Sequence, residues 1–189
     1  MKVGILDTET TGLDPFDGHK IIELALFTYD IGPAFGNPPP RLLDKYIQRF
    51  DPERSVSADS LRVHGIPYEA LVGQPKFRDV AHTIHGKLAE LDLLVCHNAG
   101  FDVPFVGVEL VAAGLELPPG LQAFCTMEQG RFACFDGKLP KLQELCFAFG
   151  VDYDPKAAHA ADYDVMKTAD CFFRGFERGF YKPALKEAA

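Results

Sequence analysis

A short apolar run followed at once by two acids opens the chain and restricts the folds open to it. The run at residues 3–6 (VGIL) precedes Asp7 and Glu9. Such a run is typical of a buried strand. Because side chains alternate along a strand, the two acids face the same side. Two carboxylates on one face repel each other unless a cation joins them, and their oxygens suit Mg²⁺ or Mn²⁺. The apolar run argues against the alternative, an exposed strand edge.

The rest of the chain alternates between strand-like and helix-like apolar patterns. Strand-like segments come first and are then mixed with helical ones, which predicts a single α/β unit built around a mixed sheet. We find no internal repeat. We expect further strands at residues 21–29, 43–50, 93–96 and 123–127, helices at 58–64, 77–91, 101–113, 140–149 and 160–178, and a proline-rich loop at 32–40.

The composition is that of a globular protein. Of the 189 residues 47% are hydrophobic, enough to bury a core in one domain. We expect that domain over residues 1–180 and a short tail over 181–189. The formal net charge of −8 argues against tight, sequence-independent nucleic-acid binding through a basic surface. The acids either cover a solvated surface or surround a site that takes up cations, and charge alone leaves both open.

The N-terminus and the cysteines predict the cellular compartment. The first residues lack the apolar stretch of a signal peptide, and no apolar run approaches membrane-spanning length. The five cysteines are an odd number and contain no CxxC pair. We expect buried thiols in a reducing compartment rather than zinc ligands or disulfides. The sequence therefore predicts a cytoplasmic protein with no membrane association.

Two further acidic segments follow later in the chain. Asp102 comes shortly after the strand expected at 93–96 and begins a helix, near the end of the sheet where α/β proteins bind ligands. Its alternative role is an acid favoured at a helix N-terminus. His159 precedes the last expected helix, and Asp162 and Asp164 lie in its first turns. At about 100° per residue these two acids point to roughly opposite faces, so only one joins a shared site. A surface loop histidine is the alternative for His159.

Taken in order, these segments resemble the motifs of the DnaQ-like (DEDDh) exonuclease family over nearly the whole chain. DTETTG at residues 7–12 is similar to the first motif, HNAGFD at 97–102 to the second, and His159 followed by Asp164 to the third. Ala160 stands where a sister group carries a tyrosine, which favours the histidine subclass. Weaker similarities are IIEL at 21–24, VHGI at 63–66 and CT at 125–126.

The resemblance implies an RNase H-like fold, in which helices flank a mixed five-stranded sheet. It implies a hydrolase that releases 5′-mononucleotides from 3′ ends with two Mg²⁺ ions roughly 3.5–4 Å apart, which Mn²⁺ can replace. The implied metal ligands are Asp7, Glu9, Asp102 and Asp164. His159 is the implied general base, because an imidazole can accept a proton near neutral pH. By the same resemblance, the substrate-binding residues are Thr10, Leu13, Val63, His64, Asn98 and Phe101.

Several alternatives stay open at this point. The favoured activity is 3′→5′ hydrolysis of DNA at single-stranded or frayed ends, in replication or repair. Trimming of RNA 3′ ends is the alternative, because contacts to the 2′-hydroxyl leave no motif. The complete set of acids and histidine argues against a non-catalytic nucleic-acid-binding module. A polymerase partner is open, although no polymerase-binding tail follows the last helix. Core packing is the alternative role for Val63 and Phe101.

Two other segments carry patterns that helix packing explains better than function does. QELCF at residues 143–147 resembles a sliding-clamp-binding peptide, but its apolar residues fall at helical spacing. Aromatic and basic residues alternate over 172–182, a combination that suits stacking on a single strand. We favour a packed helix with a solvated basic face there.

Overall fold

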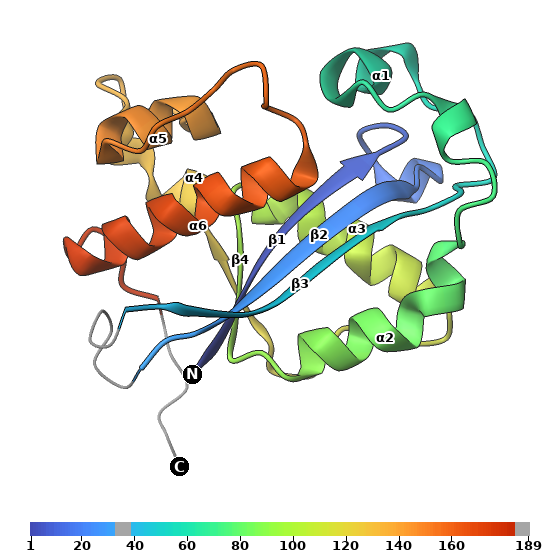
Figure 1. The fold of residues 1–189 in the computed structure, drawn as a ribbon, viewed down its shortest axis with the longest axis horizontal. Coiled ribbons are helices and arrows are strands. Elements are labelled where there is room, and N and C mark those ends of the chain that lie inside the picture. The colour runs from blue at the N-terminus through green and yellow to red at the C-terminus, as the bar shows by residue number, and fades with distance from the viewer. Residues whose placement is uncertain (33–38, 184–189) are drawn as a thin grey trace.

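The apolar run at the start of the chain becomes the central strand of a five-stranded sheet in this computed structural model (Figure 1). The strand order is β3-β2-β1-β4-β5. β1 is antiparallel to β2 and parallel to β4, β2 is antiparallel to β3, and β4 is parallel to β5. The predicted mixed five-stranded sheet is confirmed. The strands are β1 (Lys2–Thr10), β2 (Ile21–Asp30), β3 (Arg41–Arg49), β4 (Leu93–Cys96) and β5 (Gln122–Cys125).

Helices cover both faces of the sheet. α2 and α3 pack on one face and α5 and α6 on the other, while α1 stands near the carboxyl end of β1 (Figure 1). The side chains of β1 alternate between the two cores, because Val3 and Ile5 contact the α5–α6 layer and Leu6 the α2–α3 layer. The helices are α1 (Ala58–His64), α2 (Phe77–Ala89), α3 (Ala99–Ala112), α4 (Thr126–Gln129), α5 (Leu142–Phe149) and α6 (Ala161–Glu177).

The observed bounds match the predicted ones where local signals are strong. α1 has the predicted bounds: the Ser57 hydroxyl accepts the N–H of Ser60, and Gly65 ends the helix with a φ of 69°. β4 also has its predicted bounds. The strand expected at 123–127 is wrong at its end, because α4 begins at Thr126, whose hydroxyl donates to the end of β4. The other elements overlap their predicted ranges.

The structure describes residues 1–32 and 39–183. Most of the proline-rich loop predicted at 32–40, and the end of the predicted tail, lie outside the described residues. Tyr181, the first residue of that tail, is buried, and its hydroxyl donates to the carbonyl oxygen of Thr126 (3.3 Å). All five cysteines are described and are free thiols, and all but Cys134 are buried. Within the described ranges, no helix is both long and apolar enough to cross a membrane.

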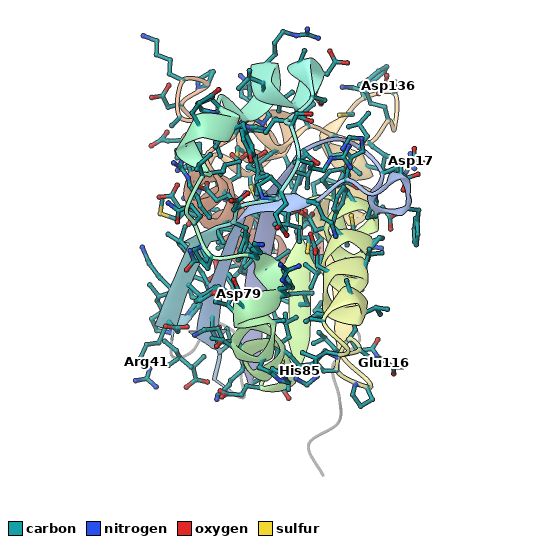
Figure 2. The ribbon with its side chains drawn as sticks, turned by 90° about the vertical axis from the view of Figure 1, so that its right-hand side faces the viewer. Asp17, Arg41, Asp79, His85, Glu116 and Asp136 are labelled. Atoms are coloured by element: carbon teal, nitrogen blue, oxygen red, sulfur yellow. The ribbon has the colours of Figure 1, made fainter. Side chains whose placement is uncertain are left out.

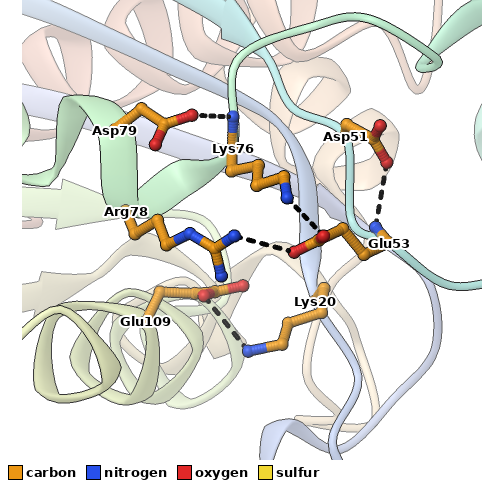
Figure 3. A network of polar contacts seen from close by, with 7 residues as sticks. All are labelled: Lys20, Asp51, Glu53, Lys76, Arg78, Asp79 and Glu109. Carbon is orange, nitrogen blue, oxygen red and sulfur yellow. Dashed lines mark hydrogen bonds and ion pairs between the residues drawn. The ribbon is translucent and has the colours of Figure 1, made fainter.

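A network of ion pairs fastens the segment after β3 to α2, and the start of β2 to α3 (Figure 3). Glu53 accepts a hydrogen bond from Lys76 and pairs with Arg78 (3.3 Å). Lys20 pairs with the buried Glu109 of α3 (3.3 Å). Exposed pairs contribute little each, but removing Lys20 would leave the Glu109 carboxylate buried and uncompensated. Because each of these cations has a carboxylate partner, we interpret the network, and the cavity of about 110 Å³ that it lines, as structural.

Candidate active site

Four carboxylates and one histidine meet at the carboxyl end of β1. Asp7 and Glu9 belong to β1, Asp102 to the first turn of α3, and Asp164 to the first turn of α6. Together with His159, just before α6, they line one hollow of about 570 Å³. The structure thus brings together the five residues predicted as metal ligands and general base, at the sheet end where α/β proteins bind ligands.

Thr8, between the two acids of β1, holds Asp102 in place. The backbone N–H and the hydroxyl of Thr8 both donate to Asp102 Oδ1, at 3.0 and 2.8 Å. Because side chains alternate along a strand, Thr8 faces α3 while its neighbours Asp7 and Glu9 project to the other side. Two hydrogen bonds to one oxygen fix the orientation of the Asp102 carboxylate relative to the hollow.

His159 holds Asp164 through its backbone. The His159 N–H donates to Asp164 Oδ2 (3.1 Å), and within the described part of the chain the buried Asp164 Oδ1 has no hydrogen-bond partner. His159 has a left-handed backbone with φ of 62°, which costs a non-glycine residue of order 1–3 kcal/mol. Strained residues of this kind cluster at functional sites. Asp162 is exposed, so only one of the two acids of the third motif joins the hollow, as predicted.

Crowding and burial raise the pKa of every carboxylate of the set. Burial, followed by repulsion from Asp102 and Glu9, raises the pKa of Asp7 well above its usual value. Burial and repulsion from Asp164 raise the pKa of Glu9 to about 9. Burial raises the pKa of Asp102 to about 7 against the opposing hydrogen bonds from Thr8. Burial also raises the pKa of Asp164. Without a cation, the carboxylates therefore cannot all be ionised at neutral pH.

A fifth acid, Glu23, lies beside the cluster and was not predicted as a site residue. Glu23 of β2 is paired in register with Glu9 of β1, and its charge contributes to the raised pKa of Glu9. Like charges directly opposite each other in a sheet are destabilising. Arg49, its register partner on β3, offsets this by donating to Glu23 Oε2 (2.5 Å). The sequence showed Glu23 only as part of the IIEL similarity, because its proximity to Glu9 depends on strand register.

The residues present fit hard divalent cations. The donors are carboxylate oxygens, their mutual repulsion is relieved by positive charge, and Asp164 Oδ1 is buried with its hydrogen-bonding capacity unused within the described chain. In the described ranges, no three acidic, histidine or cysteine side chains are already arranged to hold one ion. Binding of an ion would therefore require local adjustment of these carboxylates around the oxygens that Thr8 and His159 anchor.

The six predicted substrate-binding residues lie along two neighbouring hollows. A smaller hollow of about 180 Å³ is lined by Leu13, Val63 and His64, and it shares Glu9 and Phe101 with the catalytic hollow. Leu13 and Val63 are exposed, so core packing is wrong for Val63, whereas Phe101 also packs against the core. Thr10 lines the smaller hollow and Asn98 the catalytic one.

His64 lines this smaller hollow with a neutral imidazole. Its Nδ1 accepts the N–H of Ile66 (3.0 Å), which places the proton of the neutral ring on Nε2. Burial lowers the pKa of His64, so that the neutral form is favoured. The Nε2 atom is buried and has no hydrogen-bond partner among the described residues, so its N–H could donate to a polar group that enters this hollow.

Part of the wall of the catalytic hollow comes from residues outside the three exonuclease motifs. Lys141 and Gln143, at the start of α5, and Tyr153 and Pro155, in the loop before α6, line it. Burial raises the pKa of Tyr153 to about 12, so its hydroxyl keeps its proton. These residues carry no local signal, because only the packing of α5 and the following loop brings them to the site.

The clamp-like segment is helical in the structure, and the aromatic and basic segment is helical only as far as Glu177, where α6 ends. In the clamp-like segment at 143–147, Leu145 and Cys146 are fully buried in α5, so they cannot bind a partner. In the aromatic and basic segment, Phe172 is buried, and Arg174 donates to the carbonyl oxygens of Phe149 and Gly150. Both segments therefore help to build the α5–α6 layer.

Comparison with known proteins is consistent with this geometry. The DNA polymerase III subunit epsilon of Rickettsia felis is 34% identical over 171 residues, which cover 89% of this chain and 71% of that protein. Exonuclease X in complex with 5′-overhanging duplex DNA has a TM-score of 0.67 at 23% identity, and the match covers 95% of this chain and 94% of that one. Escherichia coli exonuclease I in complex with a dA16 oligonucleotide has a TM-score of 0.78 at 16% identity. The match covers 94% of this chain and 41% of that one.

The two structural matches bear on the fold, and they confirm the predicted RNase H-like architecture. The family is shown by sequence. A family model described as exonuclease, RNase_T, matches residues 5–172. That range is most of the chain, and it contains the four clustered carboxylates and His159. The protein therefore belongs to this exonuclease family.

Proposed function

We propose that this exonuclease removes nucleotides one at a time from the 3′ ends of DNA, single-stranded or frayed, and releases 5′-monophosphates. The observation that carries the proposal is the convergence of Asp7, Glu9, Asp102, Asp164 and His159 in one hollow that opens into a smaller, mainly apolar one. The names of the relatives, a DNA polymerase subunit and DNA-bound exonucleases, support DNA as the substrate.

Exonucleases of this type generally depend on divalent metal ions. We assign Asp7, Glu9, Asp102 and Asp164 as the ligands of two Mg²⁺ ions, for which Mn²⁺ can substitute. When bound, such ions neutralise the charge of the phosphate and make an attacking water more acidic. The four carboxylates repel each other, and ion binding relieves that repulsion.

The residues of the chain itself supply orientation and proton transfer. His159 takes the proton from the attacking water, with its imidazole positioned by the strained backbone that also holds Asp164. Leu13 and Val63 contact the terminal base, an apolar contact that tolerates any base. Beside them, His64, Thr10, Asn98 and Phe101 complete the contacts to the terminal nucleotide.

A polymerase partner is a separate proposal, supported by the name of the Rickettsia felis relative. It predicts that this chain co-elutes with the replicative polymerase of its own source when both are purified together. Elution of the exonuclease at the same position with and without the polymerase would count against association.

One assay tests the proposed reaction. Single-stranded DNA, duplex DNA with a 5′ overhang, and RNA, each labelled at the 3′ end, are compared with Mg²⁺, and a circular single strand serves as a substrate without ends. We expect labelled mononucleotides from the linear DNA and no cutting of the circle. Efficient cutting of the circle would indicate an endonuclease, and faster release from RNA would overturn the DNA assignment.

Variants locate the reaction in the proposed site. Asp7→Asn is expected to abolish mononucleotide release while the fold is retained, because the amide removes the charge of a proposed ligand. The matched control is Asp152→Asn at an exposed position before α6. Wild-type release by Asp7→Asn would show that the hydrolysis occurs elsewhere.

A further inference from the structure

A third hollow lies against α5 and adjoins the catalytic one. It has a volume of about 560 Å³ and is lined by Phe135, Lys138, Glu144 and Phe147, together with Gln143, which also lines the catalytic hollow. Asp136, another lining residue, lies at the same end of the molecule as Asp17 in the turn that follows β1 (Figure 2). Because Gln143 lines both hollows, they meet at the start of α5.

Two aromatic side chains in this hollow are far more exposed than packing requires. Phe147 of α5 is 88% exposed, although its neighbour Cys146 is fully buried, and Phe135 is fully exposed. Exposed aromatic rings that share one hollow are unfavourable in water unless they bind something. Both have accessible ring faces, and a ring face is the surface on which a nucleobase stacks.

The charged side chains that line this hollow are Asp136, Lys138 and Glu144, so the hollow itself carries no excess positive charge. Lys141 is exposed and lines the catalytic hollow, two residues before Gln143, which lines both hollows. Lys138 lines the third hollow and pairs with Glu144 (2.6 Å), so its charge is neutralised there. The rings rather than the charges are therefore the part of this hollow that suits a strand of bases. Lys141, in the neighbouring catalytic hollow, is the cation available to a phosphate.

We propose that Phe135 and Phe147 stack on unpaired bases of the substrate strand, on the 5′ side of the bond that is cleaved. This inference rests on the proposed function, because it assigns the upstream part of the same strand. Continuity with the catalytic hollow favours the substrate over a protein partner: a strand whose 3′ end occupies the catalytic hollow passes Gln143 and reaches the two rings directly. Such stacking holds the strand independently of base sequence.

Substrate length is the variable that isolates these contacts. The substrates are a long single strand and a minimal one, thymidine 5′-monophosphate p-nitrophenyl ester, which cannot reach the rings. The double variant Phe135→Leu with Phe147→Leu keeps apolar side chains and removes both rings. Stacking on an aromatic side chain contributes roughly fivefold to a hundredfold in affinity per base. We therefore expect KM for the long strand to rise at least about tenfold, with kcat and the rate on the minimal ester unchanged.

Further variants separate stacking from a structural effect. Phe135→Tyr with Phe147→Tyr retains the rings and should retain wild-type KM. Val111→Ala, at an exposed apolar position on α3, is the matched surface control. Binding of the long strand in EDTA, followed by fluorescence anisotropy, should weaken by the same factor as KM in the leucine variant. Circular dichroism of each variant verifies the fold.

The outcomes are distinguishable from those of the proposed function. If the leucine variant binds and degrades the long strand as the wild type does, the inference is wrong and the rings serve another partner. Equal losses on the long strand and the minimal ester would also overturn it, since they indicate a damaged active site. If the wild type hydrolyses no nucleic acid, the proposed function fails, while the anisotropy comparison still decides whether the rings bind a strand.

Discussion

Replacing Asp102 by asparagine should stabilise the metal-free protein, and increasingly so as the pH rises. The carboxylate of Asp102 has its pKa raised from its usual value near 3.8 to about 7, mainly by burial. Asparagine cannot ionise, and it keeps an oxygen that can accept the N–H and hydroxyl of Thr8. The substitution therefore removes the titration and leaves the hydrogen bonds in place.

The magnitude follows from the difference between the folded and unfolded proteins. Between pH 4 and pH 7 the unfolded Asp102 is ionised while the folded one keeps its proton. The folded state thus binds more protons, and the free energy of unfolding falls as the pH rises. Each pH unit is worth about 1.4 kcal/mol, so the loss over this window is about 4 kcal/mol, and between pH 5 and pH 8 it is about 3 kcal/mol. The stability advantage of Asp102→Asn should grow by that amount.

Urea unfolding in EDTA at pH 5 and pH 8 measures this difference. The unfolding is followed by circular dichroism, because the chain has no tryptophan. The control is Asp152→Asn, which removes a carboxylate at an exposed position. Saturating Mg²⁺ should reverse the order at pH 8, because the wild type gains binding free energy that the variant lacks. If Asp102→Asn exceeds the wild type in free energy of unfolding by the same amount at both pH values in EDTA, the argument from burial is refuted.

Three other outcomes follow from the structure. His159→Ala should lower kcat by roughly 10²–10⁴-fold at saturating Mg²⁺ in single-turnover measurements. The control His82→Ala, at an exposed histidine, should leave the rate unchanged. An unchanged rate in His159→Ala would show that His159 takes no part in the reaction. EDTA should stop mononucleotide release and Mg²⁺ or Mn²⁺ should restore it, and continued cleavage in chelator would rule out the metal assignment. Gly175→Ala should destabilise by roughly 1–3 kcal/mol in urea, because its Cβ would overlap the Tyr181 ring and meet Phe149 Cζ at 2.9 Å; wild-type stability would contradict this packing.

Much of the fold was predictable because its signals are local. α1 carries its own cap residues at both ends, and β4 is an apolar run between polar segments. The end of β5 was not predictable in this way. Thr126 favours strand by type, but in the structure its hydroxyl bonds to the Cys96 carbonyl oxygen (3.3 Å) and lies 3.0 Å from His97 Nδ1, contacts that depend on the neighbouring strand.

The site was predictable only as far as the motifs reach. Resemblance and alternation placed Asp7 and Glu9 together, but the proximity of Glu23 required the register of β1 against β2. Lys141 and Tyr153 reach the hollow through the packing of α5 and the loop that follows it, and neither belongs to a motif. Sequence reasoning therefore found the acids that share a strand or a motif and missed the residues that tertiary structure adds.

The two acids that come from helices show why such a cluster is tolerated. Each has one oxygen anchored by a backbone N–H: Asp102 Oδ1 by Thr8 and Asp164 Oδ2 by His159. The anchoring bonds favour the ionised form, burial opposes it, and burial prevails in both, since both pKa values are raised. Cation binding favours the ionised form without breaking the anchors, so the free energy lost to crowding in the metal-free protein becomes a driving force for binding. At these positions, the crowding that lowers the stability of the metal-free fold raises the affinity for the ions. A substitution that removes a charge should therefore stabilise the metal-free protein and weaken ion binding.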